Sequence, residues 1–151
     1  MDFRSIHVDA GQPGPSAAPD SVKLFQLAVH CDARAPALAR HAFDLVQGID
    51  RVREHARLVV TELVTNAVRH SGSAAADLIN VRASRRPGIL EIAVTDRGLS
   101  RGTPRILPHQ QDESGGLGLP IVAKLAAQWG TLRTPDDHCL VWAELAMSPT
   151  D

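Results

Sequence analysis

The sequence has few aromatic residues and few cysteines. Aromatic residues make up 3% of its 151 positions, tyrosine is absent, and the two cysteines are Cys31 and Cys139. Two cysteines in no paired spacing provide neither a disulfide framework nor a zinc ribbon, so we interpret them as buried thiols in a reducing cytoplasm. A chain of this length can bury most of the surface that it exposes when unfolded, so its core needs no crosslink.

The sequence also lacks a charge excess and a long apolar run. Sixteen Lys and Arg stand against 17 Asp and Glu, for a net charge of −1. Nucleic acid and anionic membranes attract a basic excess, so we expect neither as a direct partner. No apolar run approaches the length of a membrane span, and the first 20 residues hold Asp2 and Asp9 without the apolar core of a signal peptide. These absences predict a cytoplasmic protein.

The composition divides the chain into an arm, one domain and a short tail. Residues 11–19 are rich in Pro, Gly, Ala and Ser, which cannot bury enough apolar surface to offset the entropy of ordering them. We therefore expect a flexible arm over residues 1–20, a domain over 21–147 and a tail over 148–151. The seven His residues show no metal-ligand spacing.

Hydrophobic periodicity predicts strands and helices throughout the domain. Apolar residues alternate from residue 21, and residues 52, 56, 59, 63 and 67 recur at the spacing of an amphipathic helix. The expected elements are a strand from 21, helices over 36–47 and 51–70, strands over 77–84 and 89–95, a helix over 117–128 ended by Gly130, and strands near 131 and over 139–145. This order favours an α+β fold, a two-layer sandwich with helices on one face of a mixed, mainly antiparallel sheet.

Two polar residues of the long helix are candidates for a site. Glu62 and Asn66 are four residues apart, which places them on one helix face about one turn from each other. A helix also needs polar residues on its solvated side, so the pair alone does not establish a site.

A second candidate follows the strand over 89–95. Asp96 ends an apolar run, and Gly98 stands two positions later. Such an Asp can form a turn, or it can accept a hydrogen bond from the amino group of a base while Gly98 allows close approach.

A third candidate is the glycine-rich start of the helix over 117–128. Gly115, Gly116, Gly118 and Leu119 precede or open it, where backbone N–H groups and the helix dipole favour a phosphate. The segment is not a Walker A loop, and Ile121 stands where a dinucleotide fingerprint needs its last Gly. Irregular sequence over 97–116 precedes it, as in lids or in disordered segments.

Together, in this order, the three motifs resemble the GHKL (Bergerat-fold) ATP-binding family of histidine kinases, type II topoisomerases and heat-shock chaperones. The resemblance covers residues 21–145. The run from Glu62 to Asn66, Gln128-Trp129-Gly130 and the ending Val141-Trp142-Ala143-Glu144-Leu145 are most similar to the small anti-sigma-factor serine/threonine kinases of bacterial partner switching.

The resemblance implies ATP and Mg²⁺ as cofactors and a role for each candidate residue. Asn66 is expected to bind the Mg²⁺ that bridges the phosphates, and Glu62 to act as the catalytic base for an attacking hydroxyl. Asp96 is expected to accept the adenine amino hydrogen, with Gly98 lining the purine pocket. The further expected nucleotide-binding residues are Gly115, Gly116, Gly118 and Leu119, as phosphate donors, with 101–114 as the ATP lid.

The sequence departs from the family at two places. Leu99 and Ser100 stand where the wider family often has a second Gly, and Cys139 and Leu140 stand where a Thr often supports the adenine-binding Asp. A missing hydrogen bond in such a network costs about 1–3 kcal/mol.

The implied partners are a sigma factor, which the protein would sequester, and an anti-anti-sigma antagonist, which it would phosphorylate. A homodimer is a further expectation from the same resemblance. Two alternatives stay open: a nucleotide-binding regulatory module without catalysis, and a bare ATPase like the topoisomerase and chaperone heads, which depend on transducer domains that this chain has no room for.

Overall fold

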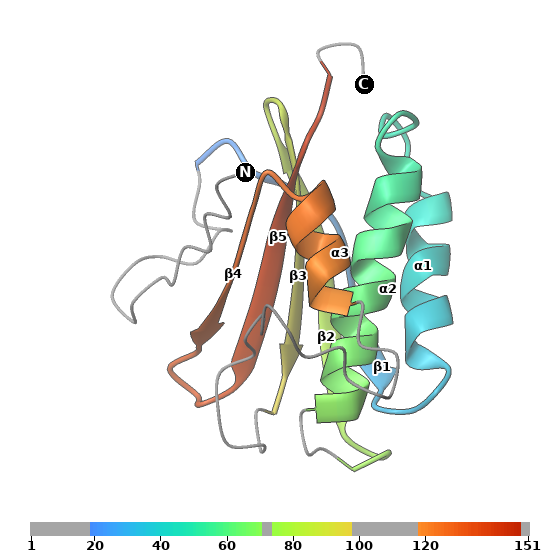
Figure 1. Ribbon diagram of the computed structural model, residues 1–151, viewed down its shortest axis with the longest axis vertical. Coiled ribbons are helices and arrows are strands. Elements are labelled where there is room, and N and C mark those ends of the chain that lie inside the picture. Colours follow the sequence, from blue (N-terminus) through green and yellow to red (C-terminus); the bar gives the residue numbers. More distant parts are fainter. Residues whose placement is uncertain (1–18, 71–73, 98–117, 149–151) are drawn as a thin grey trace.

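The computed structural model describes residues 19–70, 74–97 and 118–148, which form a sheet covered by helices. The elements are β1 (Val22–His30), α1 (Ala35–Asp44), α2 (Arg53–His70), β2 (Leu78–Arg86), β3 (Ile89–Asp96), α3 (Gly118–Leu125), β4 (Gln128–Arg133) and β5 (Cys139–Ala146). The strands lie in the order β1-β2-β3-β5-β4, and each neighbouring pair is antiparallel. The helices all lie on one face of this sheet (Figure 1). The predicted two-layer α+β sandwich is confirmed, and its sheet is antiparallel across these strands rather than mixed.

The hydrophobic core lies between the sheet and the helices. Its largest fully buried side chains are Phe43, Ile49, Leu63, Ile79, Leu90, Ile92, Leu145, Val59, Val60, Val64, Val81 and Val94. The rings of Phe25 and Phe43 meet edge to face, with centroids 4.9 Å apart, and so join β1 to α1. No helix of the described part of the chain is long and apolar enough to span a membrane.

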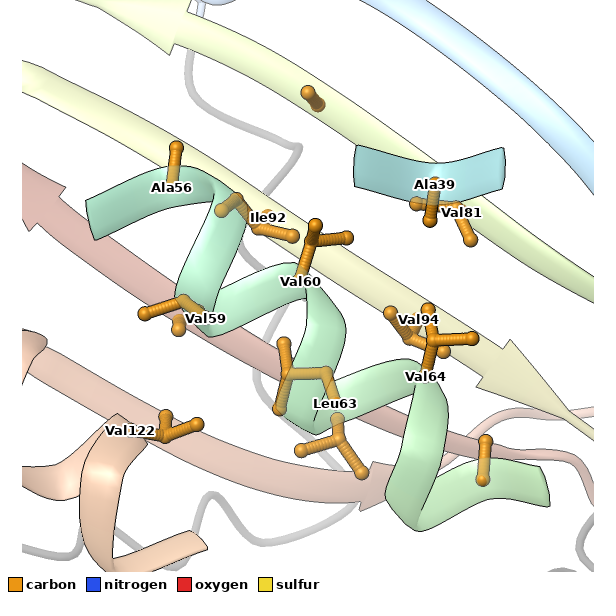
Figure 2. Close-up of a cluster of buried hydrophobic side chains, with 14 of the residues drawn as sticks. Ala39, Ala56, Val59, Val60, Leu63, Val64, Val81, Ile92, Val94 and Val122 are labelled. Atoms are coloured by element: carbon orange, nitrogen blue, oxygen red, sulfur yellow. The ribbon is translucent and has the colours of Figure 1, made fainter. Parts of the chain in front are cut away.

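Helix α2 lies along the middle of the helical layer, with α1 and α3 as its neighbours (Figure 1). The five apolar positions predicted for its buried face are all buried, although the first of them, Val52, lies just before the helix; Val60 and Val64 are buried as well. Val60 lies beside Ile92 of β3, and Val64 beside Val94 (Figure 2). Helix α2 therefore follows β3 toward the end of the strand that carries Asp96.

The prediction for residues 117–128 was wrong at its C-terminal end. Helix α3 ends at Leu125, and β4 already begins at Gln128, so Gly130 lies within a strand. The N–H of Ala126 still donates to Val122, but the N–H of Ala127 donates to Glu144 of β5. Pairing with β5 therefore overrides the helical propensity of the two alanines.

The other boundaries shifted by a few residues. Helix α1 spans 35–44 rather than 36–47, and α2 begins at Arg53 rather than directly after Asp50. Gly48 lies between the two helices with a φ of 75°, a conformation that glycine adopts without steric cost. The strand predicted over 77–84 continues to Arg86, and the turn to β3 contains Gly88 with a φ of 76°.

Candidate active site

The described candidates lie toward one end of the sandwich. The last turn of α2 and the end of β3 lie at that end, and α3 begins beside the middle of α2 and runs away from it (Figure 1). Helix α2 contacts both α3 and β3. Segments that are far apart in the sequence thereby bring the second half of α2 and the start of α3 to the same half of the sandwich as the end of β3.

Glu62 and Asn66 lie in the second half of α2, and both are half-buried. Leu63, between them in sequence, is fully buried against the sheet, and Val64 packs at Val94. This anchoring fixes the rotation of α2, so that Glu62 and Asn66 lie at the boundary between the core and solvent. Asn66 follows Val64 by about 3 Å along the helix axis. It therefore lies level with the end of β3.

Asp96 is the last residue of β3 and is 7% exposed. It follows Ile92 and Val94 at the spacing of a strand, so it shares their helix-covered face. A carboxylate on this face is an exception in a strand whose other residues on that face are apolar. A carboxylate at the helix-covered end of a strand is unusual, because burying a charge is costly, so its placement marks Asp96 as a candidate for a functional role.

Cys139 lies directly opposite Asp96 in the β3–β5 ladder. Burial raises the pKa of its thiol to about 11, and the neighbouring charge of Asp96 contributes to the increase. The thiol is therefore protonated at neutral pH. It provides a weak donor beside the carboxylate, at the place where the resemblance led us to expect a Thr hydroxyl.

One charged pair at this end was missed by the sequence analysis. Nη1 of Arg97 lies 2.8 Å from Oδ1 of Asp77, in the segment just before β2. Arg97 stands inside the motif that begins at Asp96, but nothing in the sequence pattern marks Asp77 as its partner. Their pairing becomes visible only from the register of β2 and β3.

The remaining predicted residues are only partly described. Gly118 and Leu119 are the first two residues of α3, which begins beside the middle of α2 (Figure 1). Gly98, Gly115, Gly116 and the expected lid over 101–114 lie outside the described residues. Their roles therefore stay predictions.

The donor atoms present fit a hard cation that is held mainly by a nucleotide. Asn66 offers an amide oxygen, and among residues 19–70, 74–97 and 118–148 no group of three or more His, Cys, Asp or Glu lies together. Mg²⁺ typically binds through one or two protein oxygens together with phosphates and water. An Mg²⁺ bound with ATP is consistent with this set of ligands.

Comparisons with known proteins agree with this fold. Residues 16–141 match the family model of the histidine kinase-like ATPase domain. Among solved structures, the chain is similar to the RsbU and RsbW domains of Rv1364c from Mycobacterium tuberculosis, with a TM-score of 0.54 and 16% identity. The similarity covers 81% of this chain and 32% of that one, so this chain corresponds to about a third of the neighbour. No curated protein matches the sequence.

Proposed function

Because the chain belongs to the histidine kinase-like ATPase family, we propose that it binds ATP with Mg²⁺ and phosphorylates serine or threonine on a protein. Its targets are an anti-anti-sigma antagonist as phosphate acceptor and a sigma factor as the protein that it sequesters. The observation that supports the proposal is that the buried Asp96 ends β3, the strand along which α2 packs, and that Glu62 and Asn66 lie half-buried in the second half of α2. The RsbW domain named in the structural neighbour supports the choice of partners.

Each residue has a defined part in the proposed reaction. The carboxylate of Asp96 accepts a hydrogen bond from the adenine amino group, with the Cys139 thiol beside it. The amide oxygen of Asn66 holds the cation, which neutralises charge on the phosphates. The backbone N–H groups of Gly118 and Leu119, in the first turn of α3, bind phosphate oxygens.

Glu62 is the proposed base in the transfer step. Its carboxylate accepts the proton of the attacking hydroxyl as the hydroxyl oxygen bonds to the γ-phosphorus. The bond between that phosphorus and the bridging oxygen breaks, and ADP leaves with the electron pair. Glu62 lies one turn from Asn66, which places base and cation on the same side of α2.

Nucleotide binding is tested by calorimetric titration with ATP, with and without Mg²⁺. Asp96→Asn removes the carboxylate and should weaken binding about 5–150-fold whether or not Mg²⁺ is present, since a buried polar group left without its hydrogen bond costs about 1–3 kcal/mol. Asn66→Ala should mainly remove the benefit of Mg²⁺. Asp136→Asn, in the exposed β4–β5 turn, is the matched control and should bind as wild type. Wild-type protein that binds no ATP would refute the proposed function.

Catalysis is tested with Glu62→Gln and γ-labelled ATP, with an anti-anti-sigma protein as acceptor. A general base contributes about 10²–10⁴-fold, so the variant should lose at least a hundredfold in transfer while keeping its affinity for ATP. Glu54→Gln, two turns earlier on the same helix and exposed, is the control. Full transfer by Glu62→Gln would show that Glu62 is not the base.

A regulatory module without catalysis is the second candidate. The half-buried setting of Glu62 and Asn66 serves nucleotide binding equally well in such a module. ATP binding with the expected losses in the Asp96 and Asn66 variants, but no transfer to any antagonist by the wild type, would favour this second function.

A further inference from the structure

The ion pair between Asp77 and Arg97 lies directly beside the proposed purine site. Arg97 follows Asp96, and Asp77 precedes the first residue of β2. The ladder between β2 and β3 runs as far as Asn80 opposite Thr95. Both charged residues stand beyond that last pair. Their 2.8 Å contact therefore continues the attachment of β3 to β2 toward the end where Asp96 lies.

Asp77 is the fixed member of the pair. Its Oδ2 accepts the N–H of Ala74 at 2.8 Å, and its own N–H donates to the carbonyl of Ala74 at 2.9 Å. Its carbonyl accepts the N–H of Cys31 at 2.9 Å. The Arg97 guanidinium and then the N–H of Ala74 hold the pKa of the Asp77 carboxyl below its usual range. Asp77 is thus a charged anchor tied to its own turn and to the segment after β1.

Arg97 is the more exposed member of the pair, and Asp77 holds its guanidinium. Its side chain is 53% exposed, against 19% for Asp77, so little packing restrains it apart from this contact. An ion pair at 2.8 Å with a fixed carboxylate holds the Arg97 guanidinium at the segment before β2.

We infer that Asp77 and Arg97 are positioning residues for the adenine-binding carboxylate. The pair holds the end of β3 against the segment before β2, and so fixes the direction of the Asp96 side chain without touching the nucleotide. The inference rests on the proposed function, because it assigns a role to a residue of the same site.

Two substitutions separate positioning from a direct effect of charge. Asp77→Asn removes a negative charge and Arg97→Gln removes a positive one. A direct electrostatic effect on the phosphates of ATP would therefore strengthen binding in the first variant and weaken it in the second. Positioning predicts weaker binding in both. It also predicts the same loss for adenosine, which carries no phosphate.

The expected loss is modest, because the pair is partly exposed. Solvent-exposed ion pairs contribute little, because water screens them and the side chains lose entropy when they pair. Each variant should bind adenosine and ATP about three- to fivefold more weakly. The double variant should lose no more affinity than the single variant that binds less tightly, since both substitutions remove the same contact. Arg97→Lys keeps the charge and should recover part of the affinity.

The experiment is calorimetry with adenosine and with ATP on the full chain, alongside thermal unfolding to confirm that each variant is folded. Asp50→Asn and Arg53→Gln are the matched controls. They remove a surface ion pair of 2.7 Å at the start of α2, at the opposite end of that helix from Asn66, and should bind as wild type.

The outcomes distinguish this inference from the proposed function. If wild type and Asp96→Asn behave as proposed but both pair variants bind as wild type, the inference alone is wrong. Weaker binding in Arg97→Gln together with unchanged or stronger binding in Asp77→Asn would also overturn it, because Arg97 would then act on the ligand directly. If the wild type binds neither adenosine nor ATP, the proposed function and the inference fall together.

Discussion

The rotation of α2 about its axis determines whether Glu62 and Asn66 face the site, and one pair of substitutions tests it. Leu63 is fully buried in the core (Figure 2), whereas Leu58 on the same helix is 41% exposed. Leu63→Ala leaves a cavity and should lower the free energy of unfolding by about 2–5 kcal/mol. The melting temperature should fall by roughly 4–20 °C, at about 2–4 °C per kcal/mol for a chain of this size.

Leu58→Ala is the control, since it removes the same atoms from the same helix. An exposed side chain contributes little, and alanine has the higher helix propensity, so the change should stay within about 0.5 kcal/mol. Urea unfolding provides the assay, followed by the fluorescence of Trp129 and Trp142, which are both buried, and by far-ultraviolet circular dichroism. Equal losses in the two variants would refute the orientation of α2, and with it the placement of Glu62 and Asn66.

Three further predictions concern Glu91, Cys139 and Gly88. Burial, as the largest cause, raises the pKa of Glu91, so the stability that its protonated form contributes is complete below about pH 4.5 and is lost as the pH rises through the folded-state pKa. In urea unfolding between pH 4.5 and 7, Glu91→Gln should therefore lose less free energy of unfolding with rising pH than the wild type does. The same pH dependence in both proteins would contradict the assignment. Cys139, with a thiol pKa of about 11, should resist iodoacetamide at pH 8 in the folded protein and react in urea, as read by mass spectrometry; rapid labelling of the folded chain would count against its burial. Gly88→Ala places a methyl group in open space but at a φ of 76°, so it should cost about 1–2 kcal/mol in urea unfolding, and no loss would contradict that backbone conformation.

The elements that the sequence predicted best are those in which the hydrophobic pattern matches the face that is buried in the structure. Of the five apolar positions predicted at helical spacing, four lie in α2 and Val52 lies just before it, and all five are buried, because the helix lies with one face on the sheet. The alternation of β1 and the turn signal at Gly88 likewise predicted β1, β2 and β3. Local pattern suffices in α2 because the helix presents a single apolar face to the sheet.

The boundary between α3 and β4 could not be predicted from local pattern. Ala126 and Ala127 favour a helix, and Trp129 continues the apolar spacing. The competing interaction is the pairing of Gln128 with Glu144, which is 16 residues further along the chain. Propensity carries no information about a partner at that distance, so tertiary pairing decides where the helix ends.

The candidate site was predictable where motifs mark it. Asp96 and the pair on α2 follow from short motifs and from the family resemblance, and the structure brings them to one end of the sandwich. The role of Cys139 beside Asp96 depends on which residues of β3 and β5 face each other, which the ladder shows and the sequence does not. The glycines before α3 lie outside the described residues, so their part in the site stays a prediction.

The turn at Gly88 and the site at the other end of the hairpin are linked through the register of β2 and β3. The ladder between β2 and β3 ends with Asn80 opposite Thr95, and the contact between Asp77 and Arg97 lies just beyond that pair. A slip of β3 by one residue would turn Asp96 to the face without helices. In the register that points Asp96 toward α2, the ion pair adds an interaction at the end of the ladder nearest Asp96. It stabilises the site end of the hairpin, as the Gly88 turn stabilises the other end.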